Sequence, residues 1–223
     1  MAELVDARDL KSLEGYPLCG FDSRPRHQRF TGDDSLFMKK AKPPKSLETY
    51  WEQVTRGKPA EAKEIDPKSV VTAPWVRLKC QYGCPRYGKG YCCPPDTPGP
   101  DEMRSILDSY SRGILFHLKA AKTKSGGRIK LVQDFLASVV DLEGEMFKSG
   151  FHRAFAILSG PCTLCKECGK LKGIPCSSGY RARPSMEACG IDVYQTAWNN
   201  GFPLAPLKEK KETQNLYSLI LVE

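Results

Sequence analysis

The sequence lacks the features that would place a protein in a membrane, outside the cell or in a common enzyme class. Its 223 residues contain no run of 18 apolar residues, so no transmembrane helix is expected. The N-terminus, Met1 to Leu13, mixes acidic and basic residues and has no apolar stretch of signal-peptide length. No H-E-x-x-H, G-x-S-x-G or P-loop motif occurs. We therefore expect a soluble, cytoplasmic protein whose chemistry does not come from one of these motifs.

Histidine is also scarce, with three residues in the whole chain. His117 lies within a predicted strand and His152 beside one. A lone histidine in such a position is more often packed and hydrogen-bonded than a metal ligand. We therefore expect these side chains to be structural.

Cysteine, by contrast, is abundant, with ten residues. Five disulfides would suit a short secreted chain, which this sequence does not resemble. Nine of the ten fall into a first cysteine segment, residues 80–93, and a second cysteine segment, residues 162–189. Cysteines two or three residues apart are poorly placed to pair with one another and well placed to bind one metal centre. The spacing therefore predicts metal binding, with the isolated Cys19 as a bystander.

The second cysteine segment gives the stronger signal. Cys162, Cys165 and Cys168 form two successive C-x-x-C steps, and Cys176 follows. Such steps wrap the backbone around a cubane so that three sulfurs reach three irons, while the fourth ligand comes from elsewhere in the chain. Zinc sites more often use well-separated pairs. We predict a [4Fe–4S] cluster here, with zinc as the alternative. Cys176 is the favoured fourth ligand and Cys189 a second candidate.

The first cysteine segment contains Cys80, Cys84 and the adjacent pair Cys92 and Cys93. Because the side chains of adjacent residues diverge, we expect one of the pair to bind. We favour Cys93, which precedes a proline as cluster ligands in bacterial ferredoxins do. Three thiolates would hold a cubane with one iron open to a substrate, sulfide or water, and that iron could act as a Lewis acid. A complete site, with Cys189 or a histidine as fourth ligand, and a zinc knuckle are the alternatives.

The chain is moderately basic, since 34 Lys and Arg residues against 26 Asp and Glu give a net charge of +8. This excess permits nucleic-acid binding without requiring it. The aromatic residues are not interleaved with basic ones as a stacking platform would need, so nucleic acid is an unlikely partner. Basic residues within the second cysteine segment could stabilise an anionic cluster or dock an acidic redox partner. They are Lys166, Lys170, Lys172, Arg181 and Arg183.

The pattern of apolar residues predicts a short series of helices and strands. Residues 1–45 read as an irregular arm, residues 58–69 as a charged linker and residues 70–78 as an extended stretch interrupted by Pro74. Helices are expected at 46–57, 101–111, 129–149 and 186–199, and strands at 114–118, 153–158 and 216–222.

This order of elements predicts an α+β fold, in which helices pack on one face of a small sheet. A ferredoxin-like split β-α-β arrangement is one candidate, with the two cysteine segments as loops. We divide the chain into an N-terminal arm with one helix, residues 1–69, and a metal-binding α+β domain, residues 70–223.

Longer motifs surround the cysteines. They are Trp75-Val76-Arg77-Leu78-Lys79-Cys80, Cys84-Pro85-x-Tyr87-Gly88, Cys93-Pro94-Pro95, Gly160-Pro161-Cys162-x-x-Cys165-x-x-Cys168 and the run from Arg183 to Val193. Over about residues 70–223 the sequence resembles an uncharacterised prokaryotic family of predicted metal-binding proteins, a domain of unknown function. Cys176 fits the position of that family's later cysteine, whereas Cys92 and Cys189 look like additions. The resemblance implies a bound metal and nothing more specific.

Three functions follow from these residues. The first is a redox protein whose one or two [4Fe–4S] clusters pass electrons to or from a partner enzyme. The second is a non-redox iron–sulfur enzyme, of the lyase or desulfidase type, with an open iron at Cys80, Cys84 and Cys93. Glu187 could assist there if the two cysteine segments converge. The third is a zinc-stabilised binding module.

Overall fold

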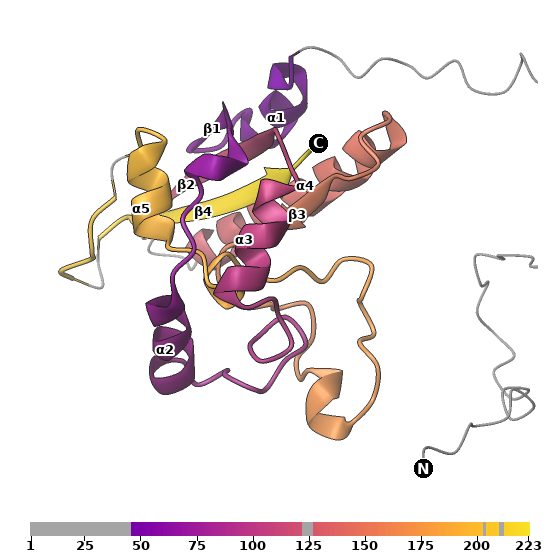
Figure 1. Ribbon diagram of the computed structural model, residues 1–223, viewed down its shortest axis with the longest axis vertical. Helices are drawn as coiled ribbons and strands as arrows, with labels where there is room; N and C mark the ends of the chain where they lie inside the picture. Colours follow the sequence, from indigo (N-terminus) through magenta and orange to yellow (C-terminus); the bar gives the residue numbers. More distant parts are fainter. Residues whose placement is uncertain (1–45, 122–126, 203, 210–211) are drawn as a thin grey trace, which may run out of the picture. The chain divides into compact units, whose positions relative to one another are not determined.

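Four antiparallel strands form the sheet of the protein (Figure 1). The computed structural model describes residues 46–121, 127–202, 204–209 and 212–223, all within one unit of the chain, Lys40–Glu223. The strands are β1 (Ala60–Ile65), β2 (Gly113–Ala120), β3 (Phe155–Ile157) and β4 (Gln214–Leu221), in the spatial order β1-β2-β4-β3. The central pair is the longest, because β2 and β4 are in register from Gly113 opposite Leu221 to Ala120 opposite Gln214.

The strand order is that of a split β-α-β unit. Both β2 and β3 pair antiparallel with β4, so they run parallel to each other with β4 between them. The helix α4 (Gly127–Lys148) makes the connection from β2 to β3. The predicted α+β class is therefore confirmed, with the split arrangement that the sequence suggested as a candidate.

One face of the sheet is covered by two helices. Alternate residues of β2, among them Ile114 and Phe116, point toward α1 (Glu48–Thr55) and α4. Val54 of α1 and Phe135 of α4 complete this core, in which the rings of Phe116 and Phe135 lie 6.3 Å apart.

The opposite face carries a second layer of shorter helices. Leu115 of β2 and Leu219 of β4 pack there with α3 (Pro100–Asp108) and α5 (Val193–Asn199). We expected helices on one face. The central strands carry apolar residues on both faces, so the second face also has to be covered.

His117 is packed on this second face, as predicted. It is 1% exposed, and its two ring nitrogens lie 2.9 Å from Glu61 Oε1 and 2.9 Å from Asn215 Oδ1. Its ring also stacks on Tyr217 at 4.6 Å between centroids. Both nitrogens are therefore engaged within the protein.

Three local predictions were wrong. Residues 60–65, read as linker, form the edge strand β1, in which the small Ala60 and Ala62 face the core, Glu61, Lys63 and Glu64 are charged and only Ile65 is buried. The helix α2 (Pro74–Gly83) replaces the end of the stretch 70–78, read as extended, and the start of the first cysteine segment, read as loop. Pro74 occupies the first turn of this helix, where a missing N–H costs nothing. The predicted helix 186–199 is divided by Gly190, whose φ of +75° separates a 3₁₀ turn, η4 (Glu187–Cys189), from α5.

The other predicted helices and strands are confirmed to within a few residues. The predicted domain boundary lies between residues 69 and 70. On its N-terminal side, α1 packs in the same core as the later elements and β1 pairs with β2 in the same sheet. The predicted arm at 1–45 and Cys19 lie outside the described residues. Within the described ranges, none of the helices combines the length and apolar character that a membrane crossing would need.

A half-buried ion pair fixes the end of the second cysteine segment to this framework. Arg183 donates from Nε and Nη2 to the two carboxylate oxygens of Glu143 on α4, at 2.7 and 2.6 Å. Glu143 is 9% exposed and also accepts the N–H of Ala156 in β3 at 2.9 Å. One carboxylate thus joins a helix, a strand and the cysteine segment.

Removal of this arginine should destabilise the fold. Arg183→Ala leaves the Glu143 carboxylate buried without its cation, so we expect the free energy of unfolding to fall by about 3–5 kcal/mol. The matched control is Arg181→Ala, which breaks a more exposed pair with Asp141 (2.7 Å) and should cost no more than about 1 kcal/mol. Urea titration followed by circular dichroism measures both. Equal losses for the two variants would contradict this role of Arg183.

Candidate metal centre

The first cysteine segment begins on a helix and continues as a compact loop. Cys80 lies in the last turn of α2 (Pro74–Gly83) and Cys84 follows as its C-cap, so the two side chains are one turn apart. The loop then folds back on itself, since the N–H of Gly88 donates to Pro94 O at 2.9 Å and that of Cys93 to Gly90 O at 3.0 Å.

The second cysteine segment reverses direction at a 3₁₀ turn, η3 (Gly169–Lys172). A Cβ at Gly169 would lie 2.8 Å from the carbonyl oxygens of Ile174 and Pro175, so the close approach requires glycine. Gly173 has φ +66°, and the N–H of Ile174 donates to Gly169 O at 3.1 Å. The reversal brings Cys176 back toward the cysteines that precede the turn.

Three contacts join the two cysteine segments. Tyr91 donates from Oη to Ile174 O at 2.9 Å, and Arg86 donates from Nη1 to Cys162 O at 3.1 Å. Lys170 also forms an ion pair with Asp96. The segments, separated by some seventy residues of sequence, therefore converge, which the sequence left open.

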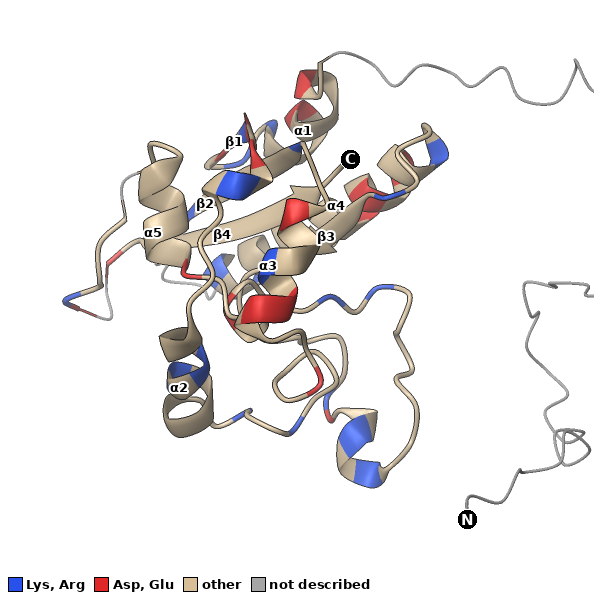
Figure 2. Ribbon diagram, in the orientation of Figure 1, with Lys and Arg blue, Asp and Glu red and all other residues tan. Residues whose placement is uncertain are grey.

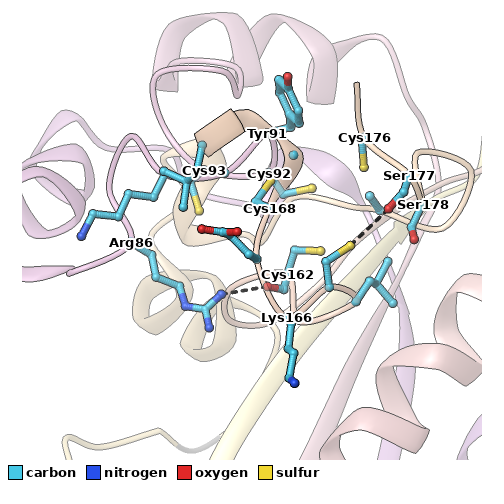
Figure 3. Close-up of a pocket in the computed structure, with 18 residues that line it drawn as sticks. Arg86, Tyr91, Cys92, Cys93, Cys162, Lys166, Cys168, Cys176, Ser177 and Ser178 are labelled. Carbon is cyan, nitrogen blue, oxygen red and sulfur yellow. Dashed lines mark hydrogen bonds between the residues drawn. The ribbon is translucent and has the colours of Figure 1, made fainter. Parts of the chain in front are cut away.

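The convergence creates a cavity of about 230 Å³ lined by six cysteines, which we call the six-cysteine cavity (Figure 3). The predicted ligands Cys162, Cys165, Cys168 and Cys176 all line it, together with Cys92 and Cys93. Its wall has a net positive charge, because Arg86, Lys89 and Lys166 contribute against one carboxylate, Glu167. Cations here lower the cost of gathering thiolates in one place.

A second cavity, of about 520 Å³, lies beside the other predicted ligands. Cys80, Cys84 and Cys93 line it, as do Cys92, Glu187 and the aromatic residues Trp75, Tyr87 and Tyr194. We call it the Glu187 cavity. Cys92 and Cys93 thus belong to the walls of both cavities, and the two predicted sites are neighbours. The sequence signal that could have shown this is the adjacency of the two cysteines, whose side chains diverge and can serve different sites.

The thiols are spread around these cavities rather than gathered at a point. Within the described part of the chain, no three Cys, His, Asp or Glu side chains are arranged to hold a single metal ion. A tetrahedral zinc ion requires four ligand atoms at about 2.0–2.3 Å from one centre. A cubane instead takes each thiolate on a different iron, so its ligands lie farther apart.

Cys189, the other candidate for a fourth ligand, lies elsewhere. It is 1% exposed and packs in the apolar core on the second face of the sheet. Desolvation raises the pKa of its thiol to about 12. It lines neither of the two cavities described above. Its surroundings therefore favour an inert, protonated thiol.

The thiols of the six-cysteine cavity differ in ionisation. A hydrogen bond donated by the Cys92 thiol lowers the pKa of Cys162 to about 6, and the N–H of Leu164 and the charge of Arg86 act in the same direction. The same hydrogen bond raises the pKa of Cys92, which stays protonated. In the Glu187 cavity, burial raises the pKa values of Cys80 and Cys93. Cys162 is therefore the anionic centre of the pair at neutral pH.

The fold and these cavities define a cysteine-rich α+β protein with a framework suited to a metal centre. The chain belongs to the family described as predicted metal-binding protein (DUF2284), which matches residues 63–222. No curated protein and no solved structure matches the chain. The family description predicts a bound metal and does not name which metal it is.

The hydrogen bond between Cys92 and Cys162 should be visible in thiol reactivity. In the metal-free, reduced protein, alkylation of Cys162 by iodoacetamide should rise with an apparent pKa of about 6, because the thiolate is the reactive form. Cys80 and Cys93 should react at higher pH. Peptide mapping by mass spectrometry across pH 5 to 9 measures this. Cys92→Ala removes the donor and should move the Cys162 profile upward. An unchanged profile in that variant would contradict the assignment.

Proposed function

We propose that the protein is an iron–sulfur protein that carries a [4Fe–4S] cluster in the six-cysteine cavity and transfers electrons to a partner enzyme. The observation that carries the proposal is that the C-x-x-C-x-x-C run and Cys176 line one small cavity with a cationic wall. Cys162, Cys165, Cys168 and Cys176 would hold the cluster, which supplies a one-electron couple when bound.

Cys176 is preferred over Cys92 as the fourth ligand. The thiolates of a cubane bind different irons, whereas hydrogen bonding to Cys92 lowers the pKa of Cys162 and raises that of Cys92. We assign Cys92 the role of a donor to the Cys162 sulfur. Hydrogen bonds to cluster sulfurs are one of the ways in which a protein sets the reduction potential.

Zinc is the less favoured alternative for this cavity. The described side chains do not converge on a single ion, and six thiols exceed what one tetrahedral ion can use. The soft thiolate set and the absence of histidine from the lining suit an iron–sulfur cluster.

The surface next to the cavity, where a redox partner would dock, combines paired basic residues with exposed apolar ones. Figure 2 shows basic residues on η3 and in the loops around it. Lys172 pairs with Glu167 at 2.7 Å and Lys170 with Asp96, so two of the three predicted docking lysines are partly neutralised. Leu164, Leu171 and Ile174 are each about half exposed beside them. This combination favours a transient, electrostatically guided contact.

A second candidate function rests on the Glu187 cavity. At about 520 Å³ it has the size of a small-molecule site, and Cys80, Cys84 and Cys93 line it. If these thiolates hold a second metal centre, a substrate could reach it. This supports the non-redox enzyme, of the lyase or desulfidase type, as the alternative.

Metal analysis tests the first proposal. The protein purified without oxygen should contain iron and acid-labile sulfide in equal amounts and absorb in the visible range. Cys165→Ala should remove about four irons, because a cubane loses a ligand there. Cys189→Ala, a change of the same size at a buried thiol away from both cavities, should leave iron unchanged. A colourless protein that contains zinc and no acid-labile sulfide would contradict the iron–sulfur proposal.

The role of Cys92 has its own test. Cys92→Ala should keep the cluster and make its reduction potential more negative, because a donor that stabilises the reduced, more anionic state is lost. Cys176→Ala should instead lose iron. Redox titration with iron analysis separates the two roles, and the reverse pattern would make Cys92 the fourth ligand.

A further inference from the structure

Glu187 has a carboxylate oxygen with no partner. Its Oε2 atom is buried, and no described residue donates a hydrogen bond to it. A buried carboxylate oxygen without a donor is costly, since it loses its hydration and gains nothing in return. Such a group calls for a cation or a proton at that position.

Among the described residues, neither Lys79, which lines the same cavity, nor Arg77 forms an ion pair with Glu187. Against the effect of burial, the positive charge of Arg77 lowers the pKa of the Cys80 and Cys189 thiols, so this side chain lies in the same region. Its guanidinium is already engaged, because Nη1 donates to Thr97 Oγ1 at 3.2 Å and Nη2 to Thr97 O at 2.8 Å and to Pro98 O.

Three thiols stand around the same space. Glu187, Cys80, Cys84 and Cys93 all line the Glu187 cavity. The Cys80 sulfur lies 3.9 Å from the backbone carbonyl oxygen of Glu187, and the charge of Glu187 acts on the Cys80 thiol. Besides burial, the charges of Cys84 and Cys80 in turn raise the pKa of the Cys93 thiol. An unpartnered carboxylate thus shares a cavity with three mutually interacting thiols.

We propose that Glu187 is the fourth ligand of a second iron–sulfur cluster, whose other ligands are Cys80, Cys84 and Cys93. This inference rests on the proposed iron–sulfur function and extends it to the first cysteine segment. An iron bound to the Glu187 carboxylate would supply the positive charge that no described residue pairs with it. The ligands are held by three elements, since α2 carries Cys80 and Cys84, the following loop carries Cys93 and η4 carries Glu187.

The mixed ligand set has a consequence for the iron that Glu187 holds. Carboxylate is a harder ligand than thiolate and suits cluster iron less well. This iron would therefore be the exchangeable one. The Glu187 cavity, which Trp75 and Tyr194 also line, would admit a small anion or thiol in place of the carboxylate, with no change in the oxidation state of the cluster.

The first test uses variants that lack the cluster of the second cysteine segment. In a Cys165→Ala background, the remaining iron should be about four per chain. Adding Glu187→Gln, which keeps the shape and removes the anionic ligand, should release about one of these irons on mild oxidation and give the EPR signal of a three-iron cluster. Glu187→Cys should restore the fourth iron. Glu145→Gln, at an exposed carboxylate of α4 that lines neither cavity, is the matched control and should change nothing.

The second test uses the unmodified chain, so it does not depend on the folding of a variant. Cyanide added to the reduced wild-type protein should change the EPR signal of one cluster and leave that of the other unchanged. Unchanged iron and EPR signals in Glu187→Gln, or no effect of cyanide, would overturn the assignment of Glu187.

The outcomes also separate this inference from the proposed function. If Cys84→Ala leaves the iron content unchanged while Cys165→Ala removes iron, the second cluster is refuted and the first stands. If the wild-type protein contains no iron, both fail.

Discussion

Repulsion between thiolates is the constraint on which the rest of this structure depends. Six cysteines line one cavity, and they cannot all ionise there without compensation. Two effects reduce this repulsion in the metal-free protein. The pKa of Cys92 is raised, so its thiol stays protonated and donates a hydrogen bond to Cys162, and Arg86, Lys89 and Lys166 supply positive charge. A bound metal cation would reduce the same repulsion more completely. This arrangement of thiols therefore favours metal binding.

The fold holds the cysteine segments together from a distance. The split β-α-β core gives a rigid sheet, and the Arg183–Glu143 pair fixes the end of the second segment against α4 and β3. The first segment is carried by α2 and its loop, and Tyr91, Arg86 and Lys170 join it to the second. The chain itself also links the two cavities, because the adjacent residues Cys92 and Cys93 line both of them. Two metal centres placed there would be close enough to influence one another.

The sequence predicted the larger part of the fold. Four of the predicted ligands, Cys162, Cys165, Cys168 and Cys176, line one cavity, and their binding of metal stays a prediction. The long helix and the three apolar strands follow from periodicity, and the C-x-x-C steps identify the second cysteine segment without a structure. The features that could not be predicted from the sequence depend on contacts between residues distant in the chain. The strand β1 looked like a linker because an edge strand exposes its charged residues, and α2 was missed because Pro74 was taken as a break. Glu187 could be noted but not placed, since its burial depends on how η4 packs near Cys80.

The most direct test of the central claim is Mössbauer spectroscopy of the protein prepared with ⁵⁷Fe under anaerobic conditions. The account predicts the quadrupole doublets of [4Fe–4S] clusters, with one cluster lost in Cys165→Ala and the other in Cys84→Ala. A spectrum showing only mononuclear iron, or a protein that takes up zinc and no iron, would contradict it.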